Sequence, residues 1–175
     1  MYSGQFAGFS HVPYRVVYYD IVGSTKEDLD AQLSALCPID QKGNKHWALT
    51  EWKTIPRWYQ FGTSNVGSSC CGTCLIDILV TLPNWKHLDD ASIELVNRWE
   101  QFIQGLMQHE MGHVKIIEEN YPLIVNALQI MELTNDNSKM IVVNKLVDRL
   151  NNEYDEKTDH GRKQLMQCFR TDYNR

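Results

Sequence analysis

The sequence predicts an α+β fold in which an antiparallel sheet, formed by the first half of the chain, packs on helices formed by the second half. Residues 1–87 are rich in turns and in β-branched and aromatic runs, whereas apolar residues recur at helical spacing through residues 88–175. No internal repeat or long linker separates the two halves, and 175 residues suffice for a hydrophobic core. We therefore expect a single domain over 1–175.

One strand and one helix are predicted near the start of the chain. Residues 14–21, YRVVYYDI, are β-branched and aromatic, which predicts a strand. Thr25 and Asp28 have the spacing of a capping box, in which two side chains bond the first backbone N–H groups of a helix. We therefore expect a helix over about 26–36, ended by Pro38, because a proline ring is incompatible with a helix interior.

Further strands are predicted before the helical half begins. Residues 46–55 and 57–62 form aromatic-rich strands on either side of Pro56. Residues 74–82 give the clearest strand signal, because isoleucine, valine and leucine occupy every second position. Pro83 is expected to end this strand.

The second half of the chain predicts three helices. The first begins near Asp89 and carries one continuous face at alternating steps of four and three residues: Leu95, Trp99, Phe102, Leu106, His109, His113 and Ile116. Pro122 is expected to begin the second helix, and a loop follows over residues 134–138. The third helix repeats the apolar spacing to about residue 155, and Gly161 is suited to ending it.

Composition and charge exclude two classes of partner. The formal net charge is −5 and the pI is about 5.6, with lysine and arginine scattered, so we expect no nucleic-acid partner. No apolar run approaches the roughly 20 residues of a membrane span, so we expect no membrane partner. The first residues lack the features of an export signal, which predicts either a cytoplasmic protein or the mature form of an exported one. Nothing in the sequence indicates an oligomeric state.

The stretch QHEMGH places a candidate metal-binding motif in the long helix. His109 and His113 are about one turn apart, so both imidazoles project from the same face and can bind one ion. Glu110 lies about 100° further round the helix, where its carboxylate can reach a metal-bound water without binding the ion. Gly112 lowers helix stability by about 1 kcal/mol relative to alanine, which indicates the close approach of another segment or room for a substrate.

A catalytic zinc site needs a third protein ligand and an open fourth position. Two later residues are candidates: Glu132 at the end of the next helix, and His160 beside a glycine in a turn. The remaining histidines, His11, His46 and His87, are interpreted as surface residues. The alternative to a metal site is a pair of buried helical histidines whose polar atoms are satisfied by hydrogen bonds within the core.

Cysteine spacing gives a weaker signal. Cys70, Cys71 and Cys74 lie together in SSCCGTC, which contains one C-x-x-C pair. A structural zinc site usually needs a second such pair. A disulfide or free thiols are therefore favoured over a metal site in this segment, and the sequence leaves the choice between them open.

Five separated stretches together resemble a bacterial family of uncharacterised domains that are described as predicted secreted zinc-dependent proteases. In chain order they are YYDIVGST, ALTEWKTIPRWYQF, VTLPNW, HEMGH and YDEKTDHG. The resemblance implies a zincin-like fold and a periplasmic or secreted location. It implies that the zinc ligands are His109, His113 and His160, and it thereby favours His160 over Glu132. It also implies that Glu110 is the catalytic carboxylate.

The same resemblance suggests roles for residues near His160. Tyr154 is placed to donate a hydrogen bond to a developing oxyanion, although it fits equally well as the last core residue of its helix. Asp155 and Asp159 are candidates to hold the second nitrogen of a ligand histidine, a contact that ligating histidines usually make.

The predicted function is the hydrolysis of peptide bonds in a peptide or protein substrate, with Zn²⁺ as cofactor. Glu110 would be the general base for a metal-activated water, and Tyr154 would help to stabilise the anionic intermediate. An exposed edge of the strand at 74–82 would pair with the extended peptide. The alternative is a catalytically inactive zincin-like module with a binding or structural role.

Overall fold

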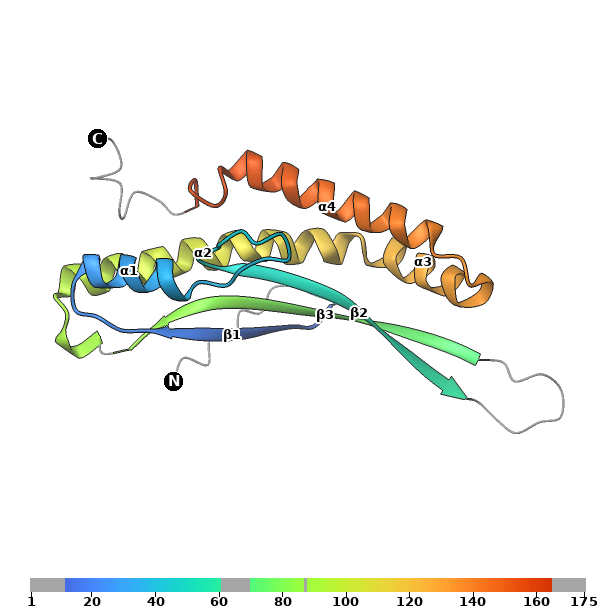
Figure 1. The fold of residues 1–175 in the computed structure, drawn as a ribbon, viewed down its shortest axis with the longest axis horizontal. Helices are drawn as coiled ribbons and strands as arrows, with labels where there is room; N and C mark the ends of the chain where they lie inside the picture. The colour runs from blue at the N-terminus through green and yellow to red at the C-terminus, as the bar shows by residue number, and fades with distance from the viewer. Residues whose placement is uncertain (1–11, 61–69, 87, 165–175) are drawn as a thin grey trace.

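A layer of helices covers one face of a three-stranded sheet in the computed structural model (Figure 1). The structure describes residues 12–60, 70–86 and 88–164, without the side chains of 56–60, 70–75 and 88. The α+β prediction is confirmed. In chain order the elements are β1 (Tyr14–Ile21), α1 (Lys26–Leu36), β2 (Leu49–Gln60), β3 (Cys70–Trp85), the short 3₁₀ helix η1 (Leu88–Asp90), α2 (Ile93–Glu119), α3 (Tyr121–Thr134) and α4 (Ser138–Thr158).

The sheet is mixed, with the strand order β1-β3-β2. β2 is antiparallel to β3, with Leu49 opposite Thr81, whereas β1 is parallel to β3, with Tyr14 opposite Ile78. The predicted antiparallel sheet is therefore wrong for β1. The physical reason is the connection: β2 and β3 follow each other directly, but the chain passes through α1 and β2 before it returns beside β1, and parallel pairing requires such a crossover.

Two prolines lie inside strands rather than at strand ends. β2 continues through Pro56, so the two predicted segments form one strand, and residues 61–62 of the prediction lie outside the described part. β2 is an edge strand of the described sheet, where a missing N–H is tolerated. β3 continues past Pro83 to Trp85, so the predicted end is wrong. Pairing with β2 stops at Thr81. At Pro83, β1 is therefore the one described strand that pairs with β3, so the missing N–H of proline interrupts no pairing with β2.

α1 begins and ends where the sequence predicts. The backbone N–H of Asp28 donates to Oγ1 of Thr25 over 3.2 Å, and the N–H of Thr25 donates to Oδ2 of Asp28 over 3.3 Å. These two bonds are the predicted capping box. The helix stops at Leu36, and Cys37 is extended because the following Pro38 disfavours helical geometry at the residue before it.

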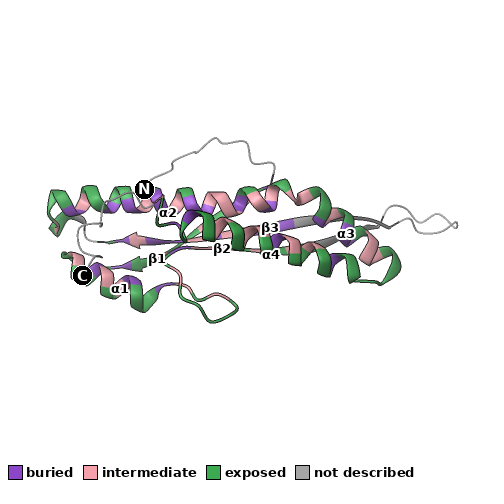
Figure 2. Ribbon diagram, turned by 90° about the horizontal axis from the view of Figure 1, so that it is seen from above, coloured by how far each residue is buried: buried purple, intermediate pink, exposed green. Residues whose placement is uncertain are grey.

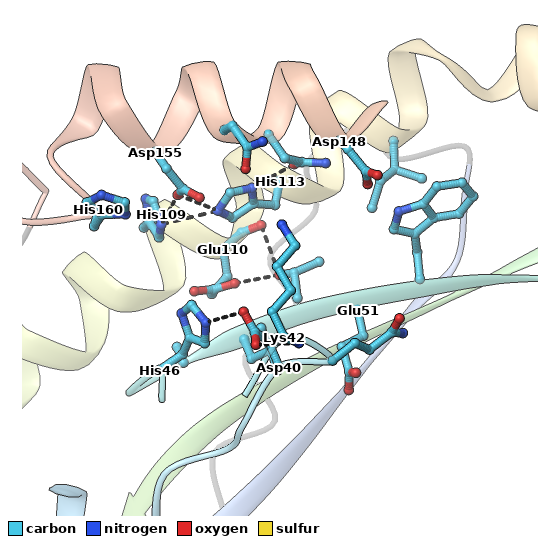
Figure 3. A pocket seen from close by; sticks show the side chains of 18 of the residues that line it. Asp40, Lys42, His46, Glu51, His109, Glu110, His113, Asp148, Asp155 and His160 are labelled. Carbon is cyan, nitrogen blue, oxygen red and sulfur yellow. Dashed lines mark hydrogen bonds and ion pairs between the residues drawn. The ribbon is translucent and has the colours of Figure 1, made fainter. Parts of the chain in front are cut away.

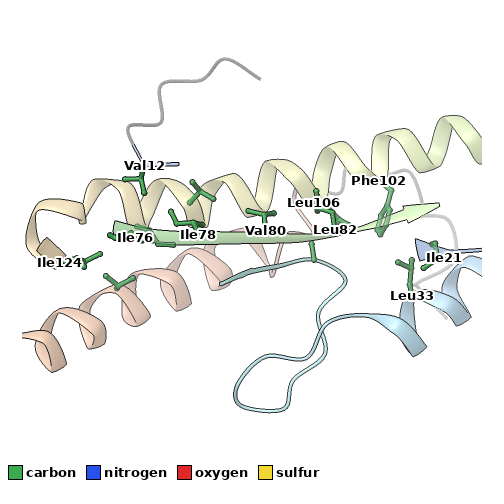
Figure 4. Close-up of a cluster of buried hydrophobic side chains, with 14 of the residues drawn as sticks. Val12, Ile21, Leu33, Ile76, Ile78, Val80, Leu82, Phe102, Leu106 and Ile124 are labelled. Carbon is green, nitrogen blue, oxygen red and sulfur yellow. The ribbon is translucent and has the colours of Figure 1, made fainter. Parts of the chain in front are cut away.

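The hydrophobic core lies between β3 and α2 (Figure 4). The predicted inward-facing residues of β3 are all at most 3% exposed: Ile76, Ile78, Val80 and Leu82. The buried apolar side chains of α2 are Leu95, Trp99, Phe102, Leu106, Val114 and Ile117. Figure 2 shows buried positions recurring along α2, whereas α4 is mostly exposed or intermediate.

The buried face of α2 moves round the helix toward its C-terminal end. From Leu95 to Leu106 the predicted stripe is buried. Further along, His109 stays buried but His113 and Ile116 are only half-buried, and Glu110 and the residues four and seven positions after it are buried. Alternating steps of four and three average 3.5 residues per turn, and such a stripe drifts by about 20° per seven residues on a helix with 3.6. The drift turns Glu110 toward the sheet and leaves His109 and His113 facing α4.

α3 and α4 follow α2 as two further helices, separated by residues 135–137, which lie within the predicted loop. α4 continues beyond its predicted end to Thr158. The backbone then takes left-handed φ values at three consecutive residues: Asp159, His160 and Gly161. Within the described part of the chain, no helix combines the length and apolarity that crossing a bilayer requires.

Candidate functional site

Three potential ligand atoms meet between α2 and α4 (Figure 3). Nε2 of His109 and Nε2 of His113 are 3.2 Å apart. Oδ1 of Asp155 lies 3.2 Å from the first of these nitrogens and 3.1 Å from the second. Two ligand atoms that each lie about 2.1 Å from a tetrahedral zinc ion are about 3.4 Å from one another. The spacing of the three atoms, which we call the acceptor cluster, is therefore close to that of a zinc site.

α4 fixes the orientation of both imidazoles. Nδ1 of His113 lies 2.7 Å from Oδ1 of Asn151, whose Nδ2 donates to the carbonyl of Val147 over 3.0 Å, so Nδ1 is the donor. Nδ1 of His109 lies 3.4 Å from Oγ1 of Thr158, whose hydroxyl donates to a carbonyl one turn back in α4. Because both Nδ1 atoms carry the proton, each neutral ring leaves a lone pair on Nε2.

The acceptor cluster therefore lacks a donor when both imidazoles are neutral. A carboxylate also only accepts hydrogen bonds, so all three atoms present lone pairs to one another. Burial opposes the charged form of His113, but its hydrogen bonds with Asp155 and Asn151 raise its pKa overall. Burial likewise opposes ionisation of Asp155, but the two histidines hold its pKa below the usual range. A positive charge at this point, from a proton or a metal ion, removes the repulsion.

Two glycines let other groups pack closely around His109. A Cβ on Gly112 would collide with the ring of Tyr154, which stacks on His109 with the ring centroids 5.2 Å apart and the planes 15° from parallel. Gly161 has a φ of +81°, and a Cβ there would lie 3.0 Å from Cγ of His109. The close approach of another segment, predicted from Gly112, is confirmed, and α4 is that segment.

The hydroxyl of Tyr154 already has two hydrogen-bond partners. It donates to the backbone carbonyl of His109 over 3.2 Å and accepts from Nε2 of Gln164 over 3.1 Å. Burial raises the pKa of Tyr154, and the bond from Gln164 opposes that rise. These contacts give Tyr154 a packing role beside His109. Its role as a donor to an oxyanion stays a prediction, and it requires the hydroxyl to leave the His109 carbonyl.

Glu110 lies on the sheet side of α2 and reaches β2. The hydroxyl of Thr50 donates to Oε2 of Glu110 over 2.6 Å, and Glu110 is only 3% exposed. Burial raises the pKa of Glu110, while the Thr50 hydrogen bond and the charges of His113 and His109 oppose the rise. A buried carboxylate with a raised pKa is suited to accepting and returning a proton. Within the described residues, Oε1 of Glu110 makes no hydrogen bond and can face a reactant.

An open cleft of about 840 Å³ passes the acceptor cluster and Glu110. Its two walls are α2 with α4, and β2 with the loop before it (Figure 3). Every residue from Leu49 to Thr54 lines the cleft, although alternate residues of a strand point to opposite faces. The cleft therefore follows the edge of β2, which pairs only with β3 among the described strands. The predicted free edge at 74–82 is wrong for residues 78–81, which pair with both β1 and β2, whereas residues 74–77 pair with β2 alone among the described strands.

The two predicted third ligands lie outside the acceptor cluster. His160 is exposed, lines the cleft and lies beside His109 in Figure 3, with a left-handed φ of 50°. Glu132 lies in the last turn of α3 and does not line the cleft. Ligation by His160 stays a prediction, whereas the geometry brings Asp155 to the third position.

Several polar contacts of the site were not predicted. Asn151 and Thr158 hold the second nitrogens of the histidines, a role predicted for Asp155 and Asp159. Asp155 instead faces the Nε2 atoms, and Asp159 is exposed. The sequence does contain a signal, because Asn151, Asp155 and Thr158 recur at steps of four and three on one helix face. Thr50 carries no comparable signal, since it reaches Glu110 from the other half of the chain.

The other histidines and the cysteine group have different outcomes. His46, interpreted as a surface residue, is half-buried and lines the cleft, with Nε2 3.0 Å from Oδ2 of Asp40. The interpretation missed this position because it depends on a loop whose shape the sequence pattern does not give. Several predictions fall on residues or side chains outside the described part: His11, His87, Cys70, Cys71 and Cys74.

Comparison with known proteins identifies a family without an activity. Residues 16–161 match the model of a family described as "Bacterial protein of unknown function (DUF922)". The matched range extends from β1 to Gly161 and so includes the acceptor cluster, Glu110 and the walls of the cleft. No curated protein and no solved structure matches the chain.

Proposed function

The chain belongs to this family of bacterial proteins of unknown function, and we propose that it is a zinc-dependent peptidase with a zincin-like arrangement of its site. One observation carries the proposal: Nε2 of His109, Nε2 of His113 and Oδ1 of Asp155 converge beside the buried carboxylate of Glu110. When both imidazoles are neutral, these three atoms present only lone pairs to one another, and a metal ion at their centre would remove that repulsion.

The residues of the cluster fit a zinc ion. Two imidazoles and one carboxylate form a donor set that catalytic zinc sites use, and three protein ligands leave the fourth position open. When bound, zinc supplies a Lewis acid and lowers the pKa of a water molecule that it binds. His109, His113 and Asp155 would hold the ion, and Asn151 and Thr158 would keep both Nε2 atoms directed toward it.

Glu110 is proposed as the general base and acid. It accepts a proton from the attacking water and passes that proton to the nitrogen of the cleaved peptide bond. Its hydrogen bond from Thr50 fixes Oε2, which leaves Oε1 to exchange the proton. Tyr154 is proposed to hold the His109 ring in place by stacking, and its packing against Gly112 keeps α4 close to α2.

We propose an extended peptide as the substrate. The cleft follows the edge of β2 over residues 49–54, which has no partner among the described strands and where a peptide can add as a further strand through backbone hydrogen bonds. Thr50 lies on this segment and bonds Glu110. A peptide paired with β2 would therefore pass directly beside the proposed general base.

The first experiment measures zinc content by elemental analysis and cleavage of a broad peptide library. We expect the wild type to retain stoichiometric zinc and to cleave peptides. Glu110→Gln is expected to keep zinc and to lower kcat by at least 10²-fold, roughly the contribution of a general acid–base group. Wild-type protein that holds zinc but cleaves no library peptide would instead indicate an inactive binding or structural module.

A second experiment identifies the third ligand from zinc affinity alone. Asp155→Ala is expected to weaken zinc binding strongly, because it removes one atom of the acceptor cluster. Glu132→Ala is the matched control and is expected to bind zinc like the wild type. Loss of zinc in His160→Ala together with retention in Asp155→Ala would restore the ligand set implied by the resemblance.

A further inference from the structure

The loop over residues 38–46, which we call the Asp40 loop, is built around one carboxylate on the cleft wall opposite α2. Oδ1 of Asp40 accepts hydrogen bonds from the backbone N–H groups of Lys42 and Asn44, each over 2.8 Å. Oδ2 accepts from Nδ2 of Asn44 over 3.0 Å and from Nε2 of His46 over 3.0 Å. Asp40 therefore accepts four hydrogen bonds. Three come from Lys42 and Asn44, and the fourth comes from the imidazole of His46, which lines the cleft.

Backbone hydrogen bonds close the same loop. The N–H of Asp40 donates to the carbonyl of Asn44 over 2.9 Å, and the N–H of Gly43 donates to the carbonyl of Asp40 over 3.0 Å. Gly43 has a φ of +88°, which favours glycine. The N–H of His46 donates to the carbonyl of Pro38 over 3.0 Å. The position of the His46 ring is thus fixed through its backbone and through its side chain.

This arrangement presents His46 to the cleft. His46, Asp40 and Glu110 all line it, as Figure 3 shows. A carboxylate only accepts hydrogen bonds, so Nε2 of His46 carries the proton, and Nδ1 of the neutral ring is an acceptor. Within the described residues, Nδ1 has no hydrogen-bond partner. A lone pair is therefore available in the cleft that the proposed general base also lines.

We propose that His46 is a further catalytic residue, whose Nδ1 accepts a hydrogen bond from the N–H of the peptide bond being cleaved; this rests on the proposed peptidase function. The water oxygen bonds the carbonyl carbon, and its proton passes through Glu110 to the peptide nitrogen. The carbon–nitrogen bond then breaks to release an acid and an amine. Positive charge develops on that nitrogen as it is protonated, and the His46–Asp40 pair, with a net charge of −1, stabilises it.

The experiment compares a peptide with its matched ester, in which the scissile N–H is replaced by oxygen. The ester has no N–H to donate and leaves as an alcohol, so it gains nothing from His46. His46→Ala is expected to lower kcat for the peptide on the order of 10²-fold, as for other single hydrogen bonds to developing charge, and to leave the ester nearly unaffected.

Two variants separate this role from loop structure. Asp40→Asn keeps Oδ1 as the acceptor for the backbone N–H groups of Lys42 and Asn44. An amide donor replaces Oδ2, which gives up the bond from Nδ2 of Asn44 and moves the ring proton of His46 to Nδ1, so that the acceptor is lost. The same selective loss on the peptide is expected. Lys42→Ala lies in the same loop and cleft, and it is expected to leave the peptide-to-ester ratio unchanged.

The outcomes distinguish this inference from the proposed function. Zinc content and the melting temperature are measured for every variant, and both are expected to match the wild type. Equal losses of peptide and ester cleavage in His46→Ala, or no loss of either, overturn the inference. The proposed function still stands in that case, provided that Glu110→Gln lowers kcat for both substrates. Zinc-loaded wild type that cleaves neither substrate overturns the proposed function and the inference together.

Discussion

The two halves of α2 have the same spacing of inward-facing residues but bury different chemistry. In the first half, Trp99 and Phe102 pack on the sheet and on one another, and the Trp99 ring meets Trp85 of β3 edge to face at 5.6 Å. In the second half, His109 and Glu110 are buried, and their polar partners come from α4 and β2.

The two halves differ in the partners that their buried side chains need. Apolar side chains in the first half are fully satisfied by other apolar side chains, so this half stabilises the fold without a ligand. When both imidazoles are neutral, the acceptor cluster in the second half needs a proton or a metal ion to remove the repulsion between its lone pairs. α2 thus keeps its spacing while its inward-facing residues change from aromatic side chains to imidazole and carboxylate groups. The first half packs the core, and the second half carries the proposed binding site. The predictions below separate the two contributions.

The largest effect is expected in the apolar half. Phe102 is 3% exposed, so Phe102→Ala removes a buried ring and should lower the free energy of unfolding by about 3–5 kcal/mol. Urea denaturation measures this loss. The folded variant at low temperature should still bind zinc stoichiometrically, and a loss of zinc affinity from the folded state would contradict the separation of the halves.

Zinc itself should stabilise only a protein with an intact acceptor cluster. At a free zinc concentration 100 times Kd, binding to the native state adds about 2.7 kcal/mol to the free energy of unfolding. Thermal unfolding with and without zinc should therefore show a higher Tm for the wild type. The same zinc concentration should leave the Tm of Asp155→Ala nearly unchanged, and an equal rise in both proteins would place the ion elsewhere.

Gly112→Ala tests the contact between the two helices. The added Cβ meets the Tyr154 ring, and overpacking of this kind costs about 1–3 kcal/mol. In a Tyr154→Ala background the collision is absent, and alanine should then stabilise the helix by up to about 1 kcal/mol. A double-mutant cycle by urea denaturation compares the two backgrounds. Equal costs in both would show that the ring does not require this glycine.

The smallest effect is expected at the start of α2. Oγ of Ser92 accepts a hydrogen bond from the N–H of Leu95 over 3.3 Å, so Ser92→Ala removes a helix cap worth about 1 kcal/mol. Chemical denaturation should detect this loss, and titration with zinc should give the wild-type Kd. A change in zinc affinity here would mean that the whole helix, and not its second half alone, positions the ligands.

The sequence predicts well whatever depends on neighbours along the chain. β1, α1 with the Thr25–Asp28 capping box, and the buried face of α2 as far as Leu106 follow from local spacing and turn chemistry. The placement of His109 and His113 on one helix face is also local. The order of the strands depends on chain connections, which explains why the parallel pairing of β1 was missed.

The site residues that were not predicted come from segments that are distant in the chain. Asp155 meets the histidines only because Gly112 lets α4 approach α2, and its residue type alone fits either a ligand or a supporting role. Thr50 reaches Glu110 from β2, and His46 lines the same cleft from the Asp40 loop. The alternation of residues along a strand and the apolar stripe of a helix show which face of its own element a residue occupies. They do not show which side chains of separate elements face one another.

The position of Asp155 on α4 has a consequence for the lifetime of the protein. α4 has few buried residues, namely Met140, Val147 and Thr158, so contacts with α2 at the acceptor cluster matter for its attachment. An ion bound there would join two helices distant in the chain and act as a removable cross-link. Chelation should then speed amide exchange more in α4 than in β3 and expose α4 to proteolysis, so that metal supply would govern how long the molecule survives.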